Sequence, residues 1–258
     1  MSVQAGRLRS SSFFIAWRSE ITGSETQMGR TIVIGDIHGC FDELIDLLDL
    51  VNLRADDRIV AVGDLIVKGP KDSDVLDRFI DDKRFSSVIG NHDRVLRQHW
   101  RGEPVRLTQA QKNTAAELAS NRARYFSFLR SLPYMIELGD HLVVHAGVRP
   151  GVPLAEQMAS DLTTLRTMGA DPSQRKGTPW YDVYRGEKIV LFGHWPAADP
   201  RRADRAIGLD TGCVYGGRLS AYIVESNEFA SVPARHAYDP PKRKLRRFRK
   251  SNADSPKS

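Results

Sequence analysis

The chain has 258 residues, of which 41% are hydrophobic, enough for one large domain with a buried core or for two small domains. Its two cysteines exclude a disulfide framework and suit a reducing compartment such as the cytoplasm, and no apolar run reaches the length of a membrane span. The net charge of +6 is uneven: seven cations lie in residues 242–250, which leaves about −1 for the rest of the chain.

We expect both ends of the chain to lie outside the fold. Residues 1–28 contain Arg and Ser with few acids, and we interpret them as a disordered leader, with an organelle transit peptide as the alternative. Asp239-Pro240-Pro241 ends the fold, because two prolines in a row cannot continue a helix or a central strand. This division predicts one domain at 29–237 and a basic disordered tail at 238–258, which is suited to contact RNA or another anionic surface.

Five short apolar runs predict buried strands, and each ends in a turn that contains Gly or His. They are Thr31–Ile34, Arg58–Val62, Ser86–Ile89, Leu142–Val144 and Ile189–Phe192. Continuous apolar runs of this length are typical of strands that are covered on both faces.

Helical patterns separate the first three predicted strands. Residues 41–51 place their leucines on one stripe, and a second helix with a similar stripe is predicted to begin with Ser73 as its cap. The order is therefore βαβαβ, with every turn at the carboxyl end of a strand, the edge at which open α/β sheets bind their ligands.

The rest of the chain has weaker patterns. Residues 94–135 are polar and helical in pattern, and we interpret them as a small helical cap insertion. Residues 149–187 are rich in Pro, Gly and Arg and predict mostly loop. Residues 207–213 and 218–224 predict two antiparallel strands around Gly216-Gly217.

The turns after the five strands carry residues that bind divalent metals. The candidate ligands, in chain order, are Asp36, His38, Asp64, Asn91, His145 and His194. Such a set is sufficient for two adjacent cations, and a two-metal site is well suited to the hydrolysis of phosphate esters. The histidines shift the preference from magnesium and calcium towards manganese, cobalt, iron or zinc, of which manganese is our first choice.

The segments GDIHG, GD-x3-KGP, GNHD, HAG and GHW resemble the calcineurin-like metallophosphoesterases of the phosphoprotein phosphatase superfamily over about residues 29–232. The stretch FGHW…LDTGCVYGGRLSA is similar to the bacterial ApaH family, the symmetrical diadenosine tetraphosphate hydrolases, and to ApaH-like phosphatases. The resemblance implies an α/β fold, a four-layer αββα sandwich with a dimetal site at one edge of its sheets.

The resemblance also implies a role for each residue. It assigns two sets of metal ligands: Asp36, His38 and Asp64 for the first ion, and Asp64, Asn91, His145 and His194 for the second. It makes Asp64 the bridge between the ions and His92 the acid that protonates the leaving oxygen.

One departure from the superfamily pattern is informative. Protein Ser/Thr phosphatases have Asp-Arg-Gly where this chain has Val67-Lys68-Gly69. The Val67 side chain cannot accept a hydrogen bond from His92, and Lys68 keeps the positive charge without the two-pronged geometry of Arg. ApaH-type enzymes also lack that Asp, so the departure favours them.

We therefore predict a dimetal-dependent hydrolase of dinucleoside polyphosphates, with symmetrical cleavage, that also acts on RNA ends carrying such nucleotides. Lys68 and Arg166 are the candidate phosphate-binding residues, followed by Arg94 and Arg149.

One alternative is a Ser/Thr protein phosphatase of the same superfamily. The other is a non-catalytic module that binds metal or nucleic acid, against which the complete ligand set argues. The chain between His145 and His194 is short for an ApaH, which predicts a truncated nucleotide pocket. The oligomeric state is left open.

Overall fold

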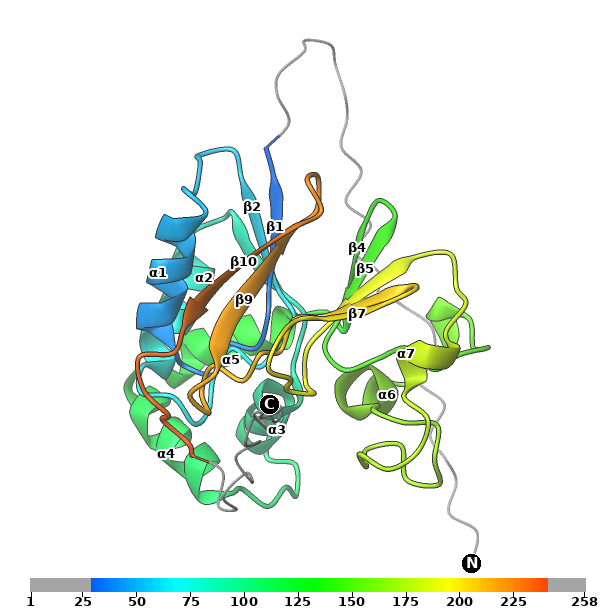
Figure 1. Cartoon of the computed structure of the whole chain (residues 1–258). Helices are drawn as coiled ribbons and strands as arrows, with labels where there is room; N and C mark the ends of the chain where they lie inside the picture. Colours follow the sequence, from blue (N-terminus) through cyan, green and yellow to red (C-terminus); the bar gives the residue numbers. More distant parts are fainter. Residues whose placement is uncertain (1–28, 241–258) are drawn as a thin grey trace, which may run out of the picture.

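The computed structural model describes residues 29–240, so the predicted leader at 1–28 and the basic run at 242–250 lie outside the described residues. Two five-stranded sheets face each other, with helices on both outer sides (Figure 1). The first sheet contains β10 (Glu228–Pro233), β9 (Arg218–Ile223), β1 (Thr31–Ile34), β2 (Arg58–Ala61) and β3 (Phe85–Ser87), in that spatial order. The second contains β4 (Met135–Leu138), β5 (His141–Val144), β6 (Ile189–Phe192), β8 (Ala206–Gly208) and β7 (Arg201–Ala203).

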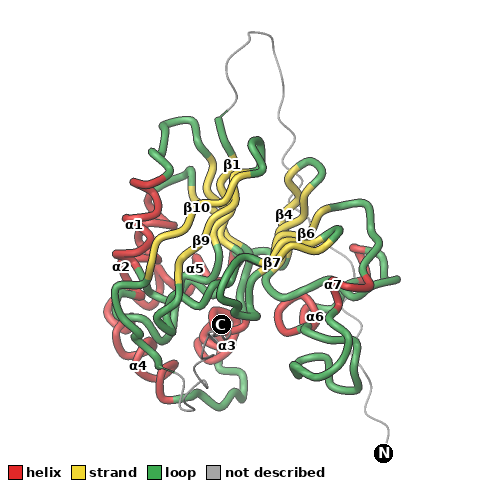
Figure 2. Tube along the Cα trace, viewed as in Figure 1, coloured by secondary structure: helices red, strands yellow, loops and turns green. Residues whose placement is uncertain are grey.

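Helices cover the two outer faces unequally, as the red segments of Figure 2 show. The first sheet is covered by α1 (Phe41–Leu50), α2 (Asp72–Asp81), α3 (Asn91–Arg101), α4 (Gln109–Glu117), the 3₁₀ turn η1 (Leu118–Asn121) and α5 (Arg122–Ser131). The second sheet is covered by shorter segments, namely η2 (Leu154–Glu156), α6 (Ala159–Thr164) and α7 (Trp180–Val183). Within the described residues, no helix is long and apolar enough to cross a membrane.

Three apolar cores correspond to the three interfaces of a four-layer sandwich. Alternation along β1 sends Ile32 and Ile34 into the core beneath the helices of the first sheet, and Val33 into the core between the sheets. In the second sheet, Leu191 of β6 faces the inter-sheet core, while Phe192 packs with Trp180 on the outer side. The αββα sandwich implied by the resemblance is therefore confirmed.

The strand order confirms the predicted βαβαβ unit. β1 pairs parallel with β2, and β2 pairs parallel with β3. In the second sheet, β6 is parallel to both β5 and β8. Each sheet therefore has three parallel strands whose carboxyl ends lie at one edge, and the following turns carry the candidate ligands.

Two local predictions were wrong. The strands predicted around Gly216-Gly217 do not pair with each other, because β8 belongs to the second sheet and β9 to the first. The loop between them crosses from one sheet to the other. Ser73 does not cap α2, because the helix begins at Asp72 with Lys71 at the N-cap position, two residues before Ser73. The Ser73 hydroxyl instead donates to Glu117.

The segment at 94–135 contains α4, η1, α5 and most of α3. β4, which the sequence pattern missed, begins at its last residue, Met135. Its side chains Leu96, Trp100 and Leu129 are buried in the core of the first sheet. The interpretation of this segment as a cap, and the domain limits at 29–237, stay predictions.

Replacing Leu191 should destabilise the fold, because its fully buried side chain lies between the two sheets. We expect Leu191→Ala to lower the free energy of unfolding by about 2–5 kcal/mol in a denaturant titration. Leu50→Ala is the matched control, since Leu50 is 57% exposed, and it should change that free energy by less than about 0.5 kcal/mol. Equal losses in both variants would contradict the position of Leu191 at the centre of the sandwich.

Candidate dimetal site

The six candidate ligands come together from the strand ends of both sheets. Asp36 and His38 follow β1, Asp64 follows β2, and Asn91 begins α3 after β3. His145 and His194 come from the other sheet, where they follow β5 and β6. All of them are buried except Asn91, which is partly exposed.

The first group of ligand atoms surrounds one oxygen of Asn91. His145 Nε2 and His194 Nδ1 each lie 2.9 Å from Asn91 Oδ1. His145 Nε2 also lies 3.4 Å from Asp64 Oδ2. The other ring nitrogen of His145, Nδ1, donates to the carbonyl oxygen of Val62 at 2.9 Å, so Nε2 carries a lone pair that points at these oxygens.

A second group lies on the other side of Asp64. His38 Nε2 is 3.6 Å from Asp64 Oδ2 and 4.0 Å from Asp36 Oδ2. His38 Nδ1 donates to the carbonyl oxygen of Ile66 at 3.2 Å, which again leaves the lone pair of Nε2 directed at carboxylates. Asp64 therefore belongs to both groups, as a bridging ligand must.

The arrangement fits cations and little else. Carboxylate oxygens, an amide oxygen and imidazole lone pairs face one another at short range, which is repulsive unless positive charge lies between them. His194 Nε2 is also buried without a hydrogen-bond partner among the described residues. Two divalent ions, one on each side of Asp64, would satisfy this set of donor atoms.

The pKa shifts of the buried ligands also favour a bound cation. Burial raises the pKa of Asp64 to about 6, against the opposing charge of Lys68. Burial, followed by the charges of Asp210 and Asp64, raises the pKa of Asp36 well above its ordinary value. Burial lowers the pKa of His145 to about 4, so its imidazole is already in the neutral form that binds metal. A bound cation would favour the ionised carboxylates.

The convergence of the ligands requires strained backbone conformations and close approaches of the backbone to the carboxylates. His38, Asp64 and His194 have φ values of 51°, 50° and 66°, in the left-handed region that residues other than glycine rarely adopt. A Cβ on Gly90 would lie 2.1 Å from Asp64 Oδ1, and one on Gly193 would lie 1.9 Å from Asp36 Oδ1. Only glycine allows the chain to pass so near the two carboxylates.

His92 lies beside the second group, next to His38. It has no carboxylate partner from position 67, because that residue is Val. Its backbone N–H donates to Asp64 Oδ1 at 2.9 Å, and its ring packs edge-on against His38 with centroids 5.2 Å apart. Nδ1 of His92 has no partner among residues 29–240. The Val67 side chain is buried in the apolar core, and the loop is held instead by the Val67 N–H, which donates to Asp72 Oδ1 at 2.9 Å.

The predicted phosphate-binding side chains lie on both sides of the site: Lys68 follows a strand of the first sheet, and Arg166 packs against the segment after β6 of the second. Lys68 Nζ lies 3.4 Å from His38 Nε2 and donates to the Tyr215 hydroxyl at 2.9 Å. Arg166 Nη2 donates to the carbonyl oxygen of His194 at 3.2 Å. The further candidates lie elsewhere: Arg149 forms a two-pronged ion pair with Asp161, and Arg94 donates to Thr163.

Asp210 and Tyr215 are two residues of the site to which sequence reasoning assigned no role. Asp210 follows β8, a further parallel strand of the second sheet, and burial and the charge of Asp64 raise its pKa to about 6. A weaker signal was present: Asp210 follows an apolar run, but Leu209 separates it from Gly208, whereas Asp36 and Asp64 come directly after a glycine. Tyr215 carries no such pattern, and only the fold brings its hydroxyl to Lys68.

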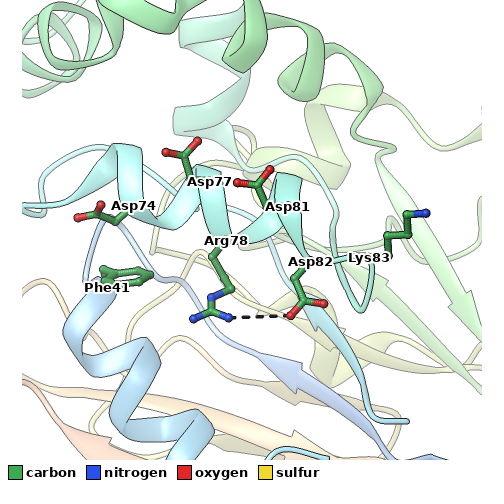
Figure 3. Close-up of a pocket in the computed structure, with 7 residues that line it drawn as sticks. All are labelled: Phe41, Asp74, Asp77, Arg78, Asp81, Asp82 and Lys83. Carbon is green, nitrogen blue, oxygen red and sulfur yellow. Dashed lines mark ion pairs between the residues drawn. The ribbon is translucent and has the colours of Figure 1, made fainter. Parts of the chain in front are cut away.

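A separate hollow on the outer face of α2 contains no candidate ligand (Figure 3). Its lining residues are Phe41, Asp74, Asp77, Arg78, Asp81, Asp82 and Lys83. Three of its carboxylates are already paired, Asp77 and Asp81 with Arg124 and Asp82 with Arg78 and Arg84. The acidic charge here is satisfied by arginines, in contrast to the converging ligands at the sheet edge.

The fold and this ligand set define a metal-dependent phosphoesterase, and comparison with known proteins agrees. The family model for the calcineurin-like phosphoesterases matches residues 29–232. The chain belongs to this family, which depends on two metal ions, and it is a hydrolase of phosphoric esters or anhydrides.

Similar proteins carry names for one substrate class but for two cleavage positions. The chain is 31% identical to the symmetrical bis(5'-nucleosyl)-tetraphosphatase of Vibrio parahaemolyticus, over 79% of this chain and 98% of that one. It is 29% identical to the asymmetrical bis(5'-nucleosyl)-tetraphosphatase PrpE of Bacillus subtilis, over 80% and 96%. A crystal structure whose protein is provisionally assigned as a diadenosine tetraphosphatase is 32% identical, with a TM-score of 0.67, and the match covers 81% of this chain and 95% of that one.

Asp64→Asn should lower turnover by orders of magnitude while the protein stays folded. The amide keeps the oxygen that accepts the His92 N–H, and Asn tolerates the positive φ at this position, but the charge between the two ligand groups is lost. The measurements are turnover, bound metal per chain and circular dichroism. Asp74→Asn in the exposed hollow is the control and should change none of them. Unchanged turnover and metal content in Asp64→Asn would show that Asp64 is not a bridging ligand.

Proposed function

We propose that the protein hydrolyses dinucleoside polyphosphates at this site, with two manganese ions as its cofactor. The observation that carries the proposal is the convergence of ligand lone pairs from both sheets on Asp64. The substrate class is supported by the names of relatives that match almost over their whole length. Asp36, His38 and Asp64 would hold one ion, and Asp64 would share the other with the remaining ligands, Asn91, His145 and His194.

Bound divalent ions would supply a nucleophilic water at neutral pH and would offset the negative charge of the reacting phosphate. The residues of the chain supply orientation and further charge. The Lys68 ammonium group, held by Tyr215, and the Arg166 guanidinium group, held against the carbonyl oxygen of His194, stabilise phosphate oxygens whose charge grows in the transition state. Within the described residues, the two cysteines are free and buried and neither serves as a nucleophile here.

His92 is proposed to protonate the leaving oxygen. Burial and the charge of Lys68 lower the pKa of His92 well below its ordinary value, so its ring is neutral before the substrate binds. A phosphate dianion beside the ring opposes both effects and raises that pKa. His92 would therefore take up its proton together with the anionic substrate, which links its acid role to an occupied site.

Two alternatives are less well supported. As a protein phosphatase, this chain would lack the Asp that orients the histidine, because position 67 holds a Val that is buried in the core. It would also lack the Arg at position 68, where it has Lys. A non-catalytic binding module has no need for a complete ligand set held with backbone strain. Action on nucleotide-capped RNA, contact of the tail with RNA, and cytoplasmic location stay predictions.

Metal-loaded protein should show a higher kcat/KM on diadenosine tetraphosphate than on any phosphopeptide. A polyphosphate offers several anionic groups, so binding away from the reacting phosphorus is available to stabilise the transition state. The assay compares diadenosine tetraphosphate, ATP, a phosphopeptide and p-nitrophenyl phosphate after treatment with a chelator and after return of manganese or cobalt. Full activity in the chelated sample, or a clear preference for the phosphopeptide, would overturn the proposal.

The cleavage position follows from chromatography of the products. We propose symmetrical cleavage, on the similarity of the segments around His194 and Asp210 to the symmetrical enzymes, and this predicts ADP as the product. ATP together with AMP would instead assign the protein to the asymmetrical type, whose relatives are equally similar.

The loss of kcat in His92→Asn should depend on the leaving group of the substrate. If His92 donates the proton, its loss slows phenyl phosphate, whose phenolate is a poor leaving group, far more than p-nitrophenyl phosphate. We expect the ratio of the two kcat values to change by about tenfold or more. Equal slowing of both esters would indicate that His92 only positions the neighbouring ligands. His99→Asn on the outer end of α3 is the control.

A further inference from the structure

Two guanidinium groups hold the short segment that carries a metal ligand. Arg166 Nη2 donates to the carbonyl oxygen of His194 at 3.2 Å. Arg201 Nη2 donates to the carbonyl oxygen of Pro196 at 3.1 Å, and Arg201 Nη1 donates to that of Trp195. The Arg201 side chain also lies over the Trp195 ring, 5.2 Å from its centroid. Both positive charges are therefore fixed beside the dimetal site by backbone carbonyl groups.

A third arginine joins them through the loop that follows α6. The Arg166 N–H donates to the carbonyl oxygen of Pro172 at 2.7 Å, and Arg166 Nη1 donates to that of Ser173 at 2.7 Å. These contacts fold the loop over Arg166 and bring Arg175 close enough for its charge to lower the pKa of both Arg166 and Arg201, after the larger effect of burial. Arg175 is exposed and forms no hydrogen bond or ion pair with residues 29–240.

The positive charges of these three arginines are not offset by ion pairs. None of them forms an ion pair with a carboxylate of the described residues, whereas Arg30, Arg149 and others do. Arg166 Nε is buried with no acceptor in that part of the chain. Arg166 and Arg201 are partly buried and Arg175 is exposed, and bringing three like charges together is unfavourable by itself. A guanidinium group cannot lose its proton to relieve the repulsion. A bound anion would relieve it.

We propose that Arg175 and Arg201, which lie beyond Arg166, form a subsite for phosphate groups of the substrate other than the one being hydrolysed. The proposal rests on the proposed function and deepens it by assigning the residues that distinguish a polyphosphate chain from a monoester. Arg166 lies next to the ligand His194, so a chain with its reacting phosphate at the metals would extend along this segment towards Arg201 and Arg175. Planar guanidinium groups suit the paired oxygens of phosphate.

Arg175→Gln is the cleanest test, because Arg175 is exposed and holds no other part of the structure. The readout is inhibition of p-nitrophenyl phosphate hydrolysis by orthophosphate, pyrophosphate and tripolyphosphate at a fixed concentration of free manganese. The wild-type protein should bind the longer anions more tightly. We expect the variant to weaken inhibition by tripolyphosphate about tenfold, with inhibition by orthophosphate and kcat/KM on the monoester unchanged.

A second readout does not depend on activity. Tripolyphosphate should raise the Tm of metal-loaded wild-type protein more than that of Arg175→Gln, while orthophosphate should raise both equally. Arg202→Gln is the matched control: Arg202 is the exposed neighbour of Arg201, lies over Phe229, and should leave every inhibition constant unchanged.

Two outcomes would overturn the subsite. One is equal weakening of inhibition by orthophosphate and tripolyphosphate, which indicates a general effect of surface charge. The other is no effect of chain length in either protein. If diadenosine tetraphosphate is not hydrolysed at all, the proposed function fails, but inhibition of the monoester reaction by tripolyphosphate still decides whether the arginines bind phosphate chains.

Discussion

The central constraint on this structure is that buried acceptor atoms around Asp64 repel one another and must still be held close together. Two carboxylates, an amide oxygen and the lone pairs of neutral imidazoles converge there from both sheets. Burial has already set the imidazoles to the neutral form and made ionisation of the carboxylates costly. Divalent cations remove that cost, and the packing of the two sheets holds the acceptor atoms in position to bind them.

That constraint accounts for the way the sandwich is built. Each sheet contributes parallel strands whose carboxyl ends meet at one edge, and the core between the sheets holds those edges together. Glycines next to the ligands allow the backbone to approach the carboxylates, and three ligands occupy the left-handed region. Conformational strain of about 1–3 kcal/mol for each such residue is a cost that the apolar cores on both sides of the sheets must offset.

The distribution of positive charge indicates how one family fold serves different phosphate substrates. Lys68 belongs to the first sheet and is held by Tyr215, while Arg166 and Arg201 belong to the side of the second sheet and are held by carbonyl groups. In the proposed function, the six candidate ligands determine where hydrolysis occurs, and these positively charged side chains determine how much negative charge can be bound beside it. Relatives of similar identity are named for opposite cleavage positions, which is consistent with the position depending on residues outside the ligand set.

The sequence by itself determined the βαβαβ unit and the family, and it named the six candidate ligands that the structure brings together. These depend on local patterns: an apolar run, a glycine turn and a polar residue at a fixed offset. It also made Lys68, which lies in the KGP motif, and Arg166, which lies in no such motif, candidate phosphate-binding residues. Only the tertiary structure decided that β8 and β9 belong to different sheets, that Asp210 joins the carboxylates, and that Tyr215 holds Lys68. These contacts join residues far apart in the chain, and they depend on how two sheets stack, which no local pattern records.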